Sequence, residues 1–116
     1  MASVNSVHLL GYVGHTPQLA VTSGGLNIAR VSLATSRITY RQDGSKLEET
    51  EWHRVVAFDR LAETICRYVQ KGNLLWVEGR LRTRSYKGRD GTPKTVTEVI
   101  AESVQFMRSQ KEDGHA

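Results

Sequence analysis

Residues 75–86, LWVEGRLRTRSY, alternate in character with a period of two, and this segment constrains the fold more than any other part of the chain. Successive side chains of a β-strand point to opposite faces. One face would be largely apolar, with Leu75, Val77, Gly79, Leu81 and Thr83. The other would carry charge and aromatic rings: Trp76, Glu78, Arg80, Arg82, Arg84 and Tyr86. Arginines about 7 Å apart match the spacing of phosphates along an extended nucleic-acid strand, although arginines also serve simply to keep a strand face in water.

Charge and cysteine content limit the function classes open to the chain. Its 116 residues carry a net charge of +4, and ten of the sixteen lysines and arginines lie between Arg54 and Lys94. The cationic surface therefore belongs to the second half of one domain and favours an anionic partner. The single cysteine cannot form an internal disulfide, and no apolar run reaches membrane-spanning length. We therefore expect a reducing compartment and no membrane partner.

Five strand patterns and one helix pattern follow one another along the chain. The predicted strands are residues 4–13, 26–36, 50–58, 75–86 and 95–107. Helical spacing appears between Leu61 and Val69, where Asp59 is the predicted N-cap and Gly72 the predicted stop. Three strands, one helix and two further strands match the all-β, five-stranded OB-fold barrel, whose short helix lies between strands 3 and 4.

The third predicted strand combines aromatic and cationic side chains on one face: Trp52, Arg54, Val56 and Phe58. Aromatic residues in strands usually pack in the core. A core position would require a buried partner for Arg54, whereas a surface that stacks bases and neutralises phosphates uses both residue types. We therefore expect this face to be a binding surface. Tyr12 and Tyr68 have no basic neighbours in alternation, so we expect them in the core.

The sequence carries no pattern typical of catalysis or metal binding. The four histidines and Cys66 lack the spacing of metal ligands, and no motif gives His53 a nucleophile or a carboxylate partner. The glycines between Lys87 and Gly91 lack the spacing of a phosphate-binding loop and suit a hairpin turn. We expect no enzymatic activity, no cofactor and no metal.

Five segments together resemble the bacterial and mitochondrial single-stranded DNA-binding protein family, SSB. They are VHLLG at 7–11, SLATS at 32–36, TEWHRVV at 50–56, RYVQKG at 67–72 and VEGRLRTR at 77–84. The resemblance covers residues 5–107 in the right order and spacing, which is far more specific than one short motif. It implies a homotetramer of OB-fold protomers that binds single-stranded DNA with little sequence preference during replication, recombination and repair. The implied address is the cytoplasm, in association with the nucleoid, rather than the mitochondrion.

The resemblance also implies roles for individual residues. Its stacking aromatics correspond to Trp52, Phe58 and Tyr86, and its phosphate-contacting side chains correspond to Arg54, Arg60, Lys71, Arg82 and Arg84. Tyr86 stands where many members carry tryptophan, and Tyr40 replaces a tryptophan expected in the loop after Ser36. Because tyrosine also offers a stacking face, we expect weaker binding per base rather than its loss. Trp76 and Glu78 are predicted to be subunit contacts or rim positions.

The end of the chain departs from the family pattern. Bacterial members usually continue through a Gly/Pro/Gln-rich linker to an acidic tip that docks partner enzymes, whereas this chain ends in KEDGHA. We expect an OB domain over residues 1–107, a short polar tail over 108–116 and no docking of partner enzymes through such a tip. Two alternatives remain open: a dimeric OB-fold adaptor of the replication-restart type that recruits a helicase, and an OB-fold enzyme or RNA-binding translation factor.

Overall fold

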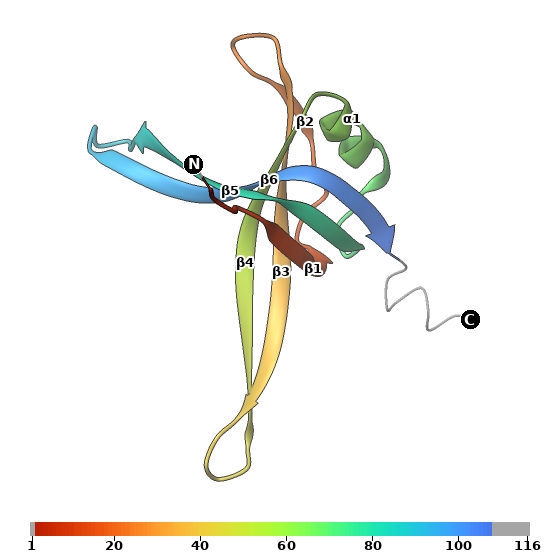
Figure 1. Cartoon of the computed structure of the whole chain (residues 1–116), viewed down its shortest axis with the longest axis vertical. Helices are drawn as coiled ribbons and strands as arrows, with labels where there is room; N and C mark the ends of the chain where they lie inside the picture. The colour runs from red at the N-terminus through yellow and green to blue at the C-terminus, as the bar shows by residue number, and fades with distance from the viewer. Residues whose placement is uncertain (1, 108–116) are drawn as a thin grey trace.

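The computed structural model describes residues 2–107, which form six strands and one helix (Figure 1). The elements in chain order are β1 Val7–Val13, β2 Leu19–Val21, β3 Asn27–Tyr40, β4 Lys46–Phe58, α1 Asp59–Tyr68, β5 Leu74–Lys87 and β6 Pro93–Met107. Figure 1 shows two long hairpins projecting from a common body: β3 with β4, pointing down, and β5 with β6, pointing left. The predicted tail over 108–116 lies outside the described residues.

Strand pairing closes the five long strands into a barrel. The sheet order is β1-β5-β6-β4-β3-β2, and β1 also pairs with β3 at Val13↔Leu33. β4 and β6 run parallel where Val55 pairs with Val99, and the other pairings are antiparallel. The predicted five-stranded OB barrel is confirmed, with its helix between the third and fourth long strands, β4 and β5.

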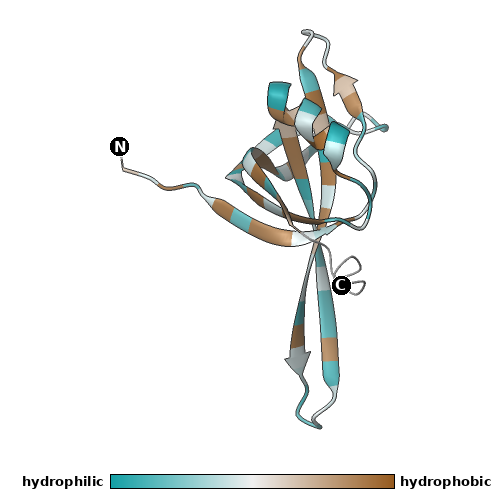
Figure 2. Ribbon diagram, turned by 90° about the vertical axis from the view of Figure 1, so that its right-hand side faces the viewer, coloured by the Kyte–Doolittle hydropathy of each residue, from teal (hydrophilic) through white to brown (hydrophobic). Residues whose placement is uncertain are grey.

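The barrel interior is filled by alternate residues of each strand, as the two-residue period requires. Leu33 of β3, Val55 of β4 and Leu75 of β5 are almost completely buried in one apolar cluster. Helix α1 contributes Ala62 and Ile65 to the same cluster, and Figure 2 shows the helix packed at one end of the barrel. Full burial of an aliphatic side chain of this size contributes about 1.5 to 3 kcal/mol to stability. The cluster therefore stabilises the barrel strands, whose outward-facing side chains form the surface.

The alternation predicted for residues 75–86 is present, but its apolar face is buried only in its first half. Leu75 and Val77 are buried, whereas Leu81 is 49% exposed because β5 and β6 leave the barrel as a hairpin. A β-bulge separates the two halves, since Glu78 pairs with Ser103 and Gly79 pairs with Ala101. A Cβ atom at Gly79 would collide with the carbonyl group of Ile100, so this crossing point requires glycine.

Both ends predicted for the helix were wrong. The N-cap is Phe58 in extended backbone, without a side-chain cap hydrogen bond, and Asp59 is the first helical residue with a φ of 57°. The helix ends where the N–H of Val69 donates to the Ile65 carbonyl at 2.9 Å. Gly72, at a φ of 90°, belongs to the following turn, and its N–H donates to the Val13 carbonyl at 2.8 Å. Asp59 and Gly72 therefore lie near the start and after the end of the helix, but neither residue caps it.

Other differences follow from strand pairing outside the core. The short strand β2 was not predicted, and all three of its residues are exposed. β3 and β4 continue to the pair Tyr40↔Lys46, beyond the predicted limits at residues 36 and 50, because backbone hydrogen bonding needs no buried face. Tyr12 and Tyr68 are exposed, so their predicted place in the core was wrong.

Candidate nucleic-acid interface

The outer face of β3 and β4 brings together the first group of predicted site residues. Antiparallel register places Trp52 opposite Ala34, Arg54 opposite Ser32 and Phe58 opposite Ile28. Side chains at these positions share one face of the sheet, and the residues across from the aromatic and cationic groups are small or aliphatic. Trp52 and Arg54 are exposed, whereas Phe58 is half-buried and packs against a buried cluster of Ile28, Val56 and Ile100.

Trp52 is held in the open by a glycine that the sequence analysis did not identify. Its side chain is 59% exposed. A Cβ atom at Gly14 would lie 2.5 Å from Cζ3 and 3.0 Å from Cη2 of the indole, so the ring rests against the backbone of Gly14. The N–H of Gly14 donates to the Ser32 carbonyl at 2.8 Å and fixes this support to β3. One side of the indole is thus positioned while much of the ring is open to solvent.

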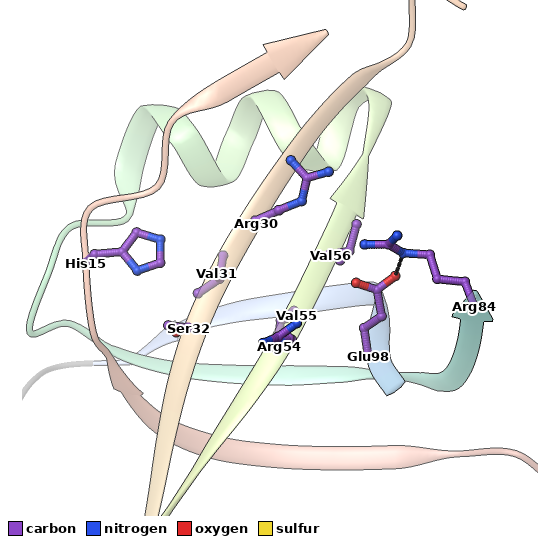
Figure 3. Close-up of a pocket in the computed structure, with 9 residues that line it drawn as sticks. All are labelled: His15, Arg30, Val31, Ser32, Arg54, Val55, Val56, Arg84 and Glu98. Atoms are coloured by element: carbon purple, nitrogen blue, oxygen red, sulfur yellow. Dashed lines mark hydrogen bonds and ion pairs between the residues drawn. The ribbon is translucent and has the colours of Figure 1, made fainter. Parts of the chain in front are cut away.

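A hollow of about 220 Å³ lies beside this support (Figure 3). It is lined by His15 from the segment before β2, Arg30, Val31 and Ser32 of β3, Arg54, Val55 and Val56 of β4, Arg84 of β5 and Glu98 of β6. Three arginines from three strands thus converge on one space with one carboxylate. Such a hollow suits an anionic group of an extended ligand.

The second group of predicted residues lies on β5 and is ion-paired with β6. Arg82 Nη2 donates to Glu98 Oε1 at 2.9 Å, and Arg84 Nε donates to the same oxygen at 2.8 Å. The guanidinium carbon of Arg82 lies 5.8 Å from the centre of the Phe58 ring, and that of Arg84 lies 5.8 Å from the Tyr86 ring. The first of these cation–π contacts joins β5 to β4, and the second lies within β5.

Among residues 2–107, Glu98 is the only polar or charged residue that is buried, with 3% of its surface exposed. Burial acts to raise the pKa of this carboxyl group, but the hydrogen bonds and charges of Arg84 and Arg82 outweigh it and hold the pKa below its ordinary value. Glu98 was not among the predicted site residues.

Three predicted residues lie apart from this group. Tyr40 is exposed at the end of β3, on the same sheet face as Ala34 by alternation, and Arg60 is exposed in the first turn of α1. Lys71 lies in the turn before β5, where its backbone N–H donates to Thr16 Oγ1 at 3.1 Å. Within residues 2–107, no hydrogen bond or ion pair joins the side chains of these three residues to the group on β4 and β5.

Trp76 and Glu78 occupy a different part of the surface. The indole Nε1 of Trp76 donates to Glu78 Oε1 at 3.0 Å, and its ring lies 6.3 Å from that of His8 on β1. His53 faces the opposite way from Trp52, and its Nε2 lies 2.8 Å from Thr35 Oγ1. In the described part of the chain, no group of three acidic, histidine or cysteine side chains could hold a metal ion. The same region contains no helix long and apolar enough to span a membrane.

A small closed barrel with exposed aromatic rings among arginines on one face has the features of OB-fold nucleic-acid-binding proteins. The model of the Single-strand binding protein family matches residues 4–107. The chain belongs to this family, which confirms the resemblance seen in the sequence.

Individual relatives agree with this membership. The chain is 37% identical over 111 residues to a single-stranded DNA-binding protein of Xylella fastidiosa and 41% identical over 109 residues to one of Xanthomonas axonopodis pv. citri. These matches cover 96% and 94% of this chain but 68% and 61% of the relatives. The chain thus spans about two thirds of the length of these relatives.

Two solved structures share the fold. A Plasmodium falciparum SSB in complex with ssDNA superposes with a TM-score of 0.81 at 32% identity, covering 92% of this chain and 97% of that one. A deletion mutant of the single-stranded DNA binding protein from Thermus aquaticus gives a TM-score of 0.79 at 31% identity, covering 92% and 52%. The alternative of a replication-restart adaptor is not favoured by these matches.

Proposed function

We propose that this chain binds single-stranded DNA with little sequence preference, across the face formed by β3, β4, β5 and β6. The observation that carries the proposal is the exposed indole of Trp52, which rests on Gly14 beside Arg54. Every base has a flat face to stack on such a ring, and every nucleotide has a phosphate to pair with a guanidinium group. Neither contact reads a base edge, so affinity is expected without sequence specificity.

The proposed path of the strand follows the aromatic residues. Trp52 and Phe58 lie on one face of β4, and Phe58 meets Arg82 of β5, whose neighbour Arg84 meets Tyr86. Tyr40 extends the same face toward the tip of the β3–β4 hairpin. We assign Arg60 and Lys71 to flanking phosphate contacts, because both are exposed cations outside the central group. Each phosphate neutralised should contribute about −0.7 to the slope of log K against log salt.

We further propose that the protein acts as a homotetramer. Leu10 and Tyr12 of β1 are exposed on the side of the sheet that also carries Trp76, because Leu10 pairs with Trp76. Exposed apolar side chains grouped on one sheet face are typical of protein contacts. Tyr12 pairs with Ala34, which pairs with Trp52, so this contact surface would border the proposed DNA-binding face. Light scattering with and without an oligonucleotide measures the assembly.

The cellular role that fits this activity is coating and protecting single-stranded DNA during replication, recombination and repair, in the cytoplasm and in association with the nucleoid. Binding requires no bond to be made or broken, so we assign no catalytic residue.

The test is fluorescence anisotropy of a labelled oligo-dT titrated with the unaltered chain, Trp52→Ala and Phe58→Ala. Loss of one stacked base costs about 1 to 3 kcal/mol, or roughly 5- to 150-fold in Kd. Tyr68→Ala is the control, because Tyr68 is 60% exposed and contacts Phe106 outside the proposed face. If Trp52→Ala and Phe58→Ala both fold and bind like Tyr68→Ala, the assigned face is wrong.

A further inference from the structure

A buried carboxylate lies within the cationic face, where a phosphate would have to approach. Glu98 accepts hydrogen bonds from Arg82 and Arg84 through one oxygen, Oε1. It also lines the same hollow as Arg30 and Arg54. A simple phosphate-binding surface gains nothing from a negative charge at this position, because that charge repels the ligand.

Glu98 can hold both arginine side chains in place without occupying all of their hydrogen-bond donors. Glu98 uses the Nε–H of Arg84 and one Nη2–H of Arg82, and each guanidinium group carries five N–H donors. Donors therefore remain for a phosphate while both side chains are held. The two arginines and the glutamate together carry one net positive charge instead of two.

We propose that Glu98 acts as an internal counter-anion of the binding face. Its carboxylate orients Arg82 and Arg84 and lowers the net positive charge of the DNA-binding surface by one. This inference rests on the proposed binding of single-stranded DNA. It assigns Glu98 as a positioning residue that limits affinity and salt dependence, so that the strand can be released.

The expected size of the effect follows from counterion release. One additional effective cation adds about 0.7 to the magnitude of the log K against log salt slope for a single strand. If the whole gain arises in this way, removing the carboxylate charge tightens binding about eightfold near 50 mM salt and about twofold near 300 mM.

Glu98→Gln tests the proposal, because glutamine keeps an oxygen that can accept both arginine hydrogen bonds and lacks the charge. The matched control is Glu102→Gln on the same strand, which changes net charge equally. Glu102 is 64% exposed and lies 3.9 Å from Arg80, so its ion pair is weak and open to solvent. Binding of labelled oligo-dT is measured by anisotropy at several salt concentrations, and circular dichroism checks folding.

We expect Glu98→Gln to bind more tightly than Glu102→Gln at low salt, with the steeper slope. A folded Glu98→Gln variant that binds equally or more weakly overturns the proposal. If the unaltered chain fails to bind the oligonucleotide, the proposed function itself is wrong, which is a distinguishable result.

A measurement on the unaltered chain decides the matter if Glu98→Gln does not fold. Carbon-13 NMR follows the carboxyl carbon of Glu98 as oligo-dT is added, because this signal reports on Glu98 itself, whereas a phosphate could accept the Nε–H of Arg84 in its place. A carboxyl signal that keeps its position supports a counter-anion that stays in place. Movement of that signal to the position of a solvated carboxylate on binding shows that DNA displaces Glu98 and overturns the proposal.

Discussion

Gly14→Ala should weaken DNA binding without removing any group that contacts DNA. The added methyl carbon would lie 2.5 Å from Cζ3 of Trp52, whereas carbon atoms pack at about 3.5 Å or more, so the indole must move by about 1 Å. The ring is 59% exposed and can swing outward. We expect a loss near the lower end of the stacking range, about 1 kcal/mol or roughly fivefold in Kd.

The stability of the same variant should not fall with its affinity. Positive φ values occur at Gly25, Gly44, Gly72 and Gly91 but not at Gly14, so alanine suits this backbone. Replacing glycine at such a position often stabilises a protein by about 0.4 to 1 kcal/mol, because the unfolded chain becomes less flexible. For Gly14→Ala we therefore expect weaker DNA binding together with an unchanged or higher free energy of unfolding.

The assay is anisotropy of labelled oligo-dT together with urea unfolding. Gly24→Ala is the control, since a Cβ atom there meets only Thr22 Oγ1, at 4.0 Å. If Gly14→Ala binds DNA as tightly as Gly24→Ala, then Gly14 does not set the position of Trp52 for stacking and the reasoning is refuted.

Three further predictions concern stability. Asp59→Gly should raise the urea midpoint by relieving a left-handed backbone conformation at φ 57°, worth about 1 kcal/mol, and a lower midpoint would show that Asp59 is not strained. Gly79→Ala should lower the free energy of unfolding by about 3 kcal/mol, because its methyl group meets the Ile100 carbonyl; an unchanged midpoint would contradict the close approach. Glu98, whose folded pKa is lowered from 4.5, contributes stability above that value that is lost as the pH falls through the folded pKa. Thermal unfolding of Glu98→Gln between about pH 6 and pH 3 should therefore show a shallower acid dependence than the unaltered chain, and an equally steep one would exclude this contribution.

Predictions from the sequence succeeded where burial creates a period. Leu75 and Val77 alternate with Trp76 and Glu78 because one face of β5 fills the barrel, and the two-residue period of residues 75–86 is visible without a structure. Leu81 continues the same period, yet it is exposed, because the period does not reveal where a strand leaves the barrel. Strand β2 carries no such signal, since all three of its residues face solvent.

The site residues divide in a similar way. Trp52 and Arg54 are conspicuous because they combine aromatic and cationic character on one strand face. Gly14 was missed because its contact with Trp52 depends on how distant parts of the chain meet. Glu98 could have been found: counting back from the hairpin turn at Lys87↔Pro93, with one residue on each strand per step, places it opposite Arg82.

The most direct test of the central claim uses Trp52 as its own reporter. The chain has two tryptophans, so Trp76→Phe leaves Trp52 as the single source of indole fluorescence. This variant is titrated with oligo-dT at low and high salt, while anisotropy of a labelled oligonucleotide measures binding independently. We predict saturable quenching of Trp52 that parallels binding and weakens with salt. Binding without quenching of Trp52, or no binding by a folded chain, would contradict the proposed stacking face.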